Sequence, residues 1–361
     1  MIRDPDIDWM RRAVRIASLS LGRTWPNPGV GCVLIRDGRL IGQGRHERCG
    51  EAHAEVLALR DAERRGESAR GATAYVTLAP CTRHGRQPPC VDALVAAGVA
   101  RVVAAIDDPN QDDARALLAK AGIAYEVGCG RALAEHVHGG FLTRIRLGRP
   151  RLTGKWAMTL DGSIAAVGGD AKWISTPEAL ALSRRRRRAF DAIVVGAGTA
   201  ARDNPSLFAV PARGRGPVRV VLSASARLDD GNLVATAART PTWLVHDANA
   251  EARAIAELAG RGIRAIAVAD AHDPAAVAQA LGREGLNDVL IEGGAAVHGG
   301  YLRAGLYDRL EVYVSAVTLG GGLPVATGAG VAAIADGARW EHECPPRLDG
   351  GTVALRLRSR R

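Results

Sequence analysis

The apolar residues in the first part of the chain follow first a helical and then an extended spacing. They recur every three or four positions over 8–21, which predicts an amphipathic helix. Two apolar runs at 30–35 and 40–44 flank Asp37-Gly38, so we expect a hairpin closed by a tight primed turn. Helices and strands then alternate, and the expected elements are a helix at 52–65, a strand at 72–78, a helix at 91–97, a strand at 101–106, a helix at 113–121 and a strand at 123–127. This order predicts a mixed sheet with helices on both faces.

A second α/β pattern starts after Gly148-Arg149-Pro150-Arg151, which predicts two domains, 1–148 and 151–361. An irregular loop is expected at 202–217, where prolines and glycines gather. The run Arg184–Arg188 is interpreted as the solvated face of a helix. The expected strands are 152–158, 192–195, 218–222, 242–245, 289–292 and 310–314, and the expected helices are 177–188, 250–258, 274–281 and 297–304.

Composition and charge narrow the class of protein. The chain has 361 residues, of which 47% are hydrophobic and 24% charged, as in soluble globular proteins. A net charge of +10 would suit nucleic acid, but the basic residues are scattered and few aromatic residues are present to stack on bases. No apolar run reaches the length of about 18 residues that a membrane span needs, and the N-terminus lacks a signal peptide's order. We therefore expect a cytoplasmic protein that binds neither nucleic acid nor membrane.

Two short segments carry the residues that a catalytic zinc site requires. His53 and Glu55 stand at the start of a predicted helix, Cys81 follows a predicted strand, and Cys90 opens the next helix. One imidazole and two thiolates suit Zn²⁺, and three protein ligands leave the fourth position to water. Glu55 would move protons between that water, the ring nitrogen and the leaving ammonia. His-x-Glu followed by Pro-Cys is the signature of the zinc deaminases.

Two details of this pattern leave alternatives open. Residues two apart lie on nearly opposite sides of a regular helix, so His53 and Glu55 can both reach one metal only if His53 occupies the very first turn. Cys81 and Cys90 are separated by eight residues instead of the usual two. His84, within that interval, would be the fourth ligand of a purely structural zinc, as in a nucleic-acid-binding module.

Taken together, longer motifs resemble a known family over nearly the whole chain. The first half contains WPNPGVGC at 25–32, GEAHAEV at 50–56, AYVTL at 74–78 and GRQPPC at 85–90. The second half contains TLDG at 159–162, WIS at 173–175, DNP at 203–205, EGG at 292–294 and AGL at 304–306. In this order they resemble the bifunctional deaminase/reductase of riboflavin biosynthesis.

This resemblance implies a cytidine-deaminase-like three-layer α/β/α domain followed by a dihydrofolate-reductase-like α/β domain. The first would use zinc to deaminate 2,5-diamino-6-(5-phosphoribosylamino)pyrimidin-4(3H)-one, and the second would use NADPH to reduce the ribosyl group of the product to ribityl. Dimers or tetramers are typical of the family, so we expect a homo-oligomer. The implied roles are zinc ligation by His53, Cys81 and Cys90, catalysis by Glu55, substrate binding by Asn27, His46, Arg86, Lys155, Arg187 and Glu292, and dinucleotide binding by Ala157, Trp173, Ala200, Asn204, Gly293 and Gly294.

Several positions depart from the family pattern. The departures are Ala79 for Glu, Arg83 for His, Ser163 for a basic residue, Ala171 for Ser, Phe208 for Thr and Val210 for Arg. Each lost charge-assisted hydrogen bond to a phosphate would weaken binding by roughly 1.5–3 kcal/mol, unless Arg213 or Arg215 substitutes. An alternative hypothesis is therefore a specialised relative with a working deaminase and an altered reductase, serving a related pathway that makes a pyrimidine-derived metabolite.

Overall fold

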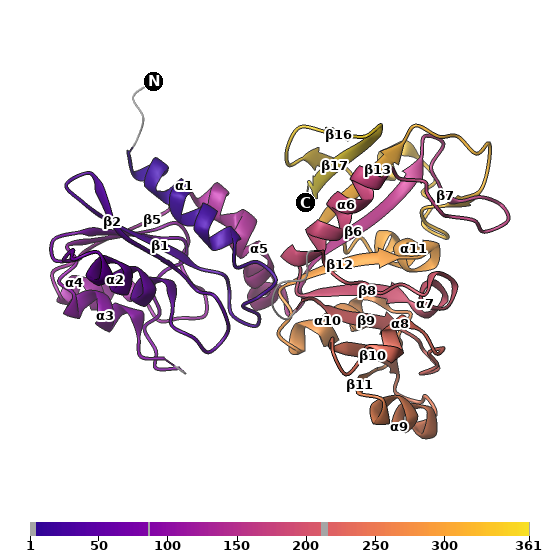
Figure 1. Ribbon diagram of the computed structural model, residues 1–361, viewed down its shortest axis with the longest axis horizontal. Helices are drawn as coiled ribbons and strands as arrows, with labels where there is room; N and C mark the ends of the chain where they lie inside the picture. The colour runs from indigo at the N-terminus through magenta and orange to yellow at the C-terminus, as the bar shows by residue number, and fades with distance from the viewer. Residues whose placement is uncertain (1–4, 86, 211–215, 361) are drawn as a thin grey trace. The chain divides into compact units, whose positions relative to one another are not determined.

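The computed structural model describes residues 5–85, 87–210 and 216–360, and its chain divides into two units, Met1–Leu147 and Gly148–Arg361 (Figure 1). Each unit has its own sheet. None of the described helices combines the length and the apolar character needed to cross a membrane.

The first unit is a five-stranded mixed sheet in the order β2-β1-β3-β4-β5. Its strands are β1 (Gly31–Arg36), β2 (Arg39–Arg45), β3 (Thr73–Val76), β4 (Arg101–Ala104) and β5 (Ala124–Val127). Its helices are α1 (Pro5–Ser18), α2 (Ala54–Arg64), α3 (Cys90–Ala96), α4 (Ala114–Lys120) and α5 (Arg131–Leu147). β1 and β2 form the expected hairpin, and Asp37 and Gly38 both have positive φ, at 51° and 70°.

Alternating residues of β1 supply two separate cores, one on each face of this sheet. Cys32 and Leu34 pack in a cluster with residues of α2, α3 and α4, whereas Val33 and Ile35 pack with residues of α1 and α5. This period of two is that of a strand buried on both faces. The result is the three-layer α/β/α arrangement expected for the first half.

The second unit is built on a ten-stranded sheet in the order β11-β10-β9-β8-β12-β6-β13-β17-β15, with β16 also paired to β17. The strands from β11 to β13 run parallel. They are β6 (Arg151–Thr159), β8 (Ala192–Gly196), β9 (Val218–Leu222), β10 (Thr242–Asp247), β11 (Ile263–Val268), β12 (Asp288–Gly293) and β13 (Arg309–Ser315). The antiparallel edge is formed by β15 (Trp340–His342), β16 (Arg347–Asp349) and β17 (Thr352–Ser359), and β7 (Ser163–Ala165) pairs separately with β14 (Leu323–Pro324).

The helices of the second unit connect these parallel strands. They are α6 (Pro177–Arg186), α7 (Ala197–Asp203), α8 (Asn232–Ala235), α9 (Ala252–Gly260), α10 (Pro274–Arg283) and α11 (Ala295–Arg303), with short 3-10 turns at Arg187–Ala189 and Ile334–Asp336. β12 lies between β8 and β6, so the chain reverses its order across the sheet there. Ligands of open α/β sheets bind at such a reversal, beyond the carboxyl ends of the strands.

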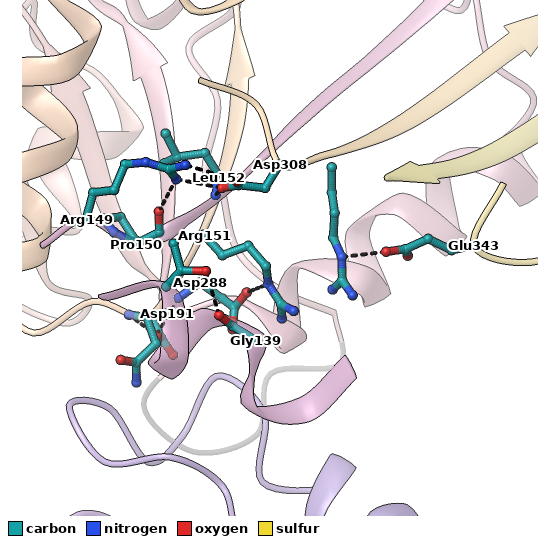
Figure 2. Close-up of polar contacts among 12 residues, drawn as sticks. Gly139, Arg149, Pro150, Arg151, Leu152, Asp191, Asp288, Asp308 and Glu343 are labelled. Carbon is teal, nitrogen blue, oxygen red and sulfur yellow. Dashed lines mark hydrogen bonds and ion pairs between the residues drawn. The ribbon is translucent and has the colours of Figure 1, made fainter. Parts of the chain in front are cut away.

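Ion pairs anchor the start of β6 inside the second unit, as Figure 2 shows. Arg149 donates two hydrogen bonds to the Asp308 carboxylate, at 2.7 and 2.9 Å, and that carboxylate also accepts the Leu152 N–H. The buried Arg151 guanidinium donates to Asp288 at 2.6 Å. Each of these arginines therefore has a carboxylate partner, and removing one partner of the buried Arg151–Asp288 pair would leave an uncompensated buried charge.

Several elements differ from the sequence expectation. The first helix spans Pro5–Ser18, three residues earlier than expected at each end. The helices α5, α7 and α8 and the strands β7, β11, β14, β15, β16 and β17 were not predicted. Gly139-Gly140 interrupts the apolar period of α5, which hides the helix in the sequence. β17 alternates apolar and polar or small residues, so its signal was present and was missed.

Candidate functional site

Three side chains with metal-binding chemistry converge at one point of the first unit. One ligand atom from each of His53, Cys81 and Cys90 lies within 4.8 Å of the other two. His53 Nδ1 is 3.2 Å from the Cys90 sulfur and 3.5 Å from the Cys81 sulfur. Zinc ligands at 2.0–2.3 Å from the metal in a tetrahedron are about 3.5 Å from each other, so the spacing fits Zn²⁺. Among the described residues, His84 does not belong to this group.

Local structure explains how both His53 and Glu55 can face one site. His53 is the N-cap of α2 and has an extended backbone, with φ −76° and ψ 166°. Its side chain therefore does not follow the helical direction that would separate it from Glu55, which lies in the first turn. Cys90 opens α3 and its N–H donates to the Cys81 sulfur at 3.2 Å. Hydrogen bonds from Cys90 and His53 lower the pKa of Cys81 to about 4, as a thiolate ligand requires.

Glu55 is buried beside these ligands. Glu55 is only 3% exposed, and this burial raises the pKa of its carboxyl group to about 7. A carboxyl group with a pKa near neutrality can both accept and return a proton.

Asn27 and His46 lie together beside this cluster. The Asn27 amide nitrogen is 3.4 Å from His46 Nε2, and the opposite ring nitrogen of His46 is 3.2 Å from the Ala52 carbonyl oxygen. The His46 and His53 rings meet edge to face, with centroids 5.2 Å apart. The predicted pyrimidine-binding pair is thus next to the predicted zinc ligand.

The long segment between the two cysteines is held at both ends. Arg83 forms an ion pair with Asp112 at 2.6 Å, and the Gln87 amide donates to the Gly50 carbonyl at 3.0 Å. Arg86, predicted to bind substrate, lies outside the described residues, as do Arg213 and Arg215.

A charged cluster in the second unit gathers the residues that the resemblance assigned to the sugar phosphate. Arg187 binds the buried Glu292 through two hydrogen bonds of 2.7 Å. Although burial opposes it, the charges of Arg187 and Lys155 lower the pKa of Glu292 to about 2. The interpretation of 184–188 as a solvated face is therefore wrong for Arg187, because its side chain is only 13% exposed and is paired with Glu292.

The turn after β12 brings main chain to the edge where the strand order reverses. Gly293 and Gly294 have φ of 56° and 102°, and Gly294 is the N-cap of α11. A Cβ on Gly293 would lie 2.5 Å from His298 Nε2, and one on Gly294 would lie 2.7 Å from the Thr199 hydroxyl. Only glycine fits here, and the free N–H groups of the helix start can face a phosphate.

The other predicted cofactor residues lie in β6, in and directly after α7, and in the segment between β7 and α6. Ala157 is half-buried in β6, Ala200 is buried in α7, and Trp173 is 73% exposed with a φ of 67°. Asn204 ends α7 in the left-handed conformation, and its side-chain oxygen accepts the Asn232 N–H at 2.7 Å. That oxygen is therefore already used within the fold.

Comparisons with known proteins match both units. Residues 3–106 match the family described as the cytidine and deoxycytidylate deaminase zinc-binding region, and residues 150–345 match the RibD C-terminal domain. The riboflavin biosynthesis protein RibD of Bacillus amyloliquefaciens is 37% identical over 321 residues, covering 87% of this chain and 85% of that protein. That of Mycobacterium tuberculosis (strain H37Rv) is 38% identical over 350 residues, covering 94% and 93%.

The chain belongs to the RibD family. Solved structures agree with this assignment. This chain superposes with a TM-score of 0.88 and 29% sequence identity on the diaminohydroxyphosphoribosylaminopyrimidine deaminase/5-amino-6-(5-phosphoribosylamino)uracil reductase of Thermotoga maritima, and the match covers 98% of this chain and 99% of that one. Acinetobacter baumannii RibD (form 1) has a TM-score of 0.88 at 33% identity, with 99% of each covered.

Membership of the RibD family confirms the fold class expected for both halves and identifies a bifunctional deaminase and reductase of riboflavin biosynthesis. Its cofactors are zinc in the deaminase domain and NADPH in the reductase domain. Because the matches cover both domains, neither the nucleic-acid-binding module nor the relative with an altered reductase is favoured.

The departures from the RibD pattern occupy defined places. Ala79 and Ser163 are buried, and Ala171 is exposed. The Arg219 guanidinium lies over the Phe208 ring, 5.4 Å from its centroid, and the Val210 N–H donates to the Arg184 carbonyl at 3.3 Å. Neither Phe208 nor Val210 can bind a phosphate through its side chain.

Sequence reasoning missed a second ion pair in the reductase cluster. Arg186 donates to the buried Glu311 carboxylate through both Nε and Nη2. Glu311 is the parallel-register partner of Lys155, because β13 and β6 are neighbours. The sequence did contain an indication of this pair, because Glu311 stands inside an otherwise apolar strand and a buried carboxylate needs a cationic partner.

Proposed function

We propose that this protein catalyses zinc-dependent hydrolytic deamination of 2,5-diamino-6-(5-phosphoribosylamino)pyrimidin-4(3H)-one, followed by NADPH-dependent reduction of the ribosyl group to ribityl. The observation that carries the first activity is the meeting of His53, Cys81 and Cys90 beside the buried Glu55. We assign the deaminase to the domain 1–148 and the reductase to 151–361.

Within the first domain, we assign zinc ligation to His53, Cys81 and Cys90. Bound Zn²⁺ would supply hydroxide near neutral pH by lowering the pKa of a coordinated water. Glu55 would carry one proton of that water to the ring nitrogen and the second to the leaving amine. Asn27 and His46 hold the pyrimidine, and Arg86 is the further substrate contact that we retain from the sequence.

In the second domain, NADPH would supply a hydride to the sugar carbon. Lys155, Arg187 and Glu292 bind the phosphorylated sugar. The main chain at Gly293-Gly294 receives the dinucleotide phosphates at the start of α11, and Ala157, Trp173, Ala200 and Asn204 complete its site. The fixed pair of Arg187 and Glu292 keeps both groups oriented before the substrate arrives, which reduces the entropy cost of binding.

Three further properties stay predictions: the cytoplasmic location, the dimeric or tetrameric state, and the absence of nucleic-acid binding. Many arginines are already paired with carboxylates, including Arg151, Arg186 and Arg187, which supports the last of these. A small phosphorylated pyrimidine is the ligand that we expect.

Glu55→Gln tests the proton transfer. The amide keeps the shape of the side chain but cannot accept a proton, so we expect zinc content to be unchanged and deaminase kcat to fall by roughly 10²–10⁴. Ammonia release and metal content are the measurements, and Glu51→Gln, which changes an exposed carboxylate nearby, is the matched control. Retained turnover in Glu55→Gln would exclude the role assigned to Glu55.

A further inference from the structure

A buried histidine and a buried tyrosine lie behind the glycine turn that follows β12. His298 is on α11 and Tyr307 follows that helix, and each is only 1% exposed. His298 Nδ1 is 2.7 Å from the Tyr307 hydroxyl oxygen. Their neighbours are aromatic: Trp156 meets the imidazole edge to face at 5.2 Å, and Tyr301 stacks on the Tyr307 ring at 5.5 Å. In such surroundings a hydrogen bond between two side chains is strong, because little water competes for it.

The imidazole limits where the turn can lie. A Cβ on Gly293 would be 2.5 Å from His298 Nε2 and 2.6 Å from Cδ2 of the same ring, so the ring packs directly against the Gly293 main chain. Gly293 has a positive φ of 56° and is followed by Gly294, the N-cap of α11. A displacement of the ring is therefore passed on to the turn, because packed interiors have little free space.

The imidazole is itself held by β6. The Tyr307 ring lies against Gly154, where a Cβ would be 2.9 Å from Tyr307 Cζ. The main chain of Lys155 is a further hydrogen-bond partner of His298. The pair therefore connects β6 to the end of β12, which carries the glycine turn. Neither His298 nor Tyr307 is among the residues assigned to zinc, substrate or dinucleotide.

We propose that the hydrogen bond between His298 and Tyr307 positions the Gly293-Gly294 main chain against β6, so that the site for the dinucleotide phosphates is formed before the ligand arrives. Both are positioning residues, because they act on the turn from the protein interior. A preformed site avoids the entropy cost of ordering the turn on binding. This inference rests on the proposed dinucleotide role of the turn and adds the residues that hold it in place.

Tyr307→Phe tests this directly, because it keeps the ring that packs on Gly154 and removes only the hydroxyl group. Loss of one hydrogen bond should raise the Kd for NADPH, measured without substrate, by roughly three- to tenfold. Tyr301→Phe is the matched control, because this tyrosine is equally buried in the same cluster and its hydroxyl has no hydrogen-bond partner among the described residues. The Kd of Tyr301→Phe should equal that of wild type.

A second measurement needs no ligand. Amide hydrogen exchange at Gly293, Gly294 and the first turn of α11 should be roughly three- to tenfold faster in Tyr307→Phe, because the turn opens more readily, and unchanged in Tyr301→Phe. His298→Leu, which removes both hydrogen bonds of the imidazole, should have a larger effect than Tyr307→Phe in both measurements.

A pair with a purely structural role would lower the free energy of unfolding and leave both the Kd and the exchange rates of the turn unchanged, and this result would overturn the inference. Equal effects of Tyr307→Phe and Tyr301→Phe would overturn it as well. A wild-type protein that does not bind NADPH refutes the proposed reductase activity instead, while the exchange rates still decide whether His298 and Tyr307 position the turn.

Discussion

Gly44 sets the distance between strand β2 and the start of helix α2, which carries the predicted deaminase residues. A Cβ at this position would lie 2.3 Å from the Ala54 carbonyl oxygen and 2.4 Å from the Ala58 nitrogen, where ordinary contacts begin at 3.4 Å. Both atoms are main chain, so no side chain can rotate away. Gly44→Ala must therefore move the first turn of α2 by about 1 Å relative to the sheet.

That displacement acts directly on the site, because His53 is the N-cap of α2 and Glu55 lies in its first turn. A misplacement of 1 Å can reduce turnover by roughly 10²-fold. We therefore expect deaminase kcat of Gly44→Ala to fall about a hundredfold, and the overpacking to cost about 1–3 kcal/mol of stability.

Ammonia release measures the deaminase, and NADPH oxidation with the deaminated compound serves as an internal control from the other unit. The matched variant is Arg39→Ala, at the start of the same strand, where the side chain is exposed. A Gly44→Ala protein that keeps its deaminase kcat would refute the reasoning. Parallel loss of both activities would also refute it, since the clash is confined to the first unit.

Two further predictions concern the stability of the second unit. Arg219 is fully buried and donates to five neutral oxygen atoms, those of Ser206, Leu233, Thr236, Thr240 and Thr242. Arg219→Met should therefore lower the free energy of unfolding, measured in urea, by about 2–4 kcal/mol, whereas the control Arg227→Met, at an exposed position, should leave it almost unchanged. A decrease below about 1 kcal/mol for Arg219→Met would contradict this prediction. Burial lowers the pKa of His298 to about 4, so the folded protein keeps it neutral while the unfolded chain protonates it below about pH 6.5. Stability should then fall by about 1.4 kcal/mol per unit as pH drops from 6.5 towards 4, and His298→Gln should reduce that slope; equal slopes in both proteins would exclude it.

The parts of the structure that could be predicted from the sequence are those with short-range signals. The β1–β2 hairpin follows from Asp37-Gly38 between two apolar runs, and the zinc ligands follow from residue types at fixed spacing. The geometry that lets His53 and Glu55 work together depends on where the helix begins, which the sequence leaves uncertain by a few residues.

The sequence pattern could not predict ion pairs between residues that are far apart in the chain. Arg186 and Arg187 resemble their neighbours in an arginine run, and only the fold shows that Glu311 and Glu292 reach them from strands more than a hundred positions away. Among the described residues, no carboxylate pairs with Arg184, Arg185 or Arg188. Chemical type alone could not separate these roles, because it is identical for all of them.

The insertion of β12 between β8 and β6 has a consequence for biogenesis. β6 is the first strand of the second unit to leave the ribosome, yet the Arg151–Asp288 pair that joins it to β12 spans 137 positions. The sheet of the first unit can close once its 147 residues have emerged, whereas β6 has open edges until translation is nearly complete. Unpaired edges attract other strands, so we expect the completion of the centre of the second sheet to be the slow step in the folding of this enzyme.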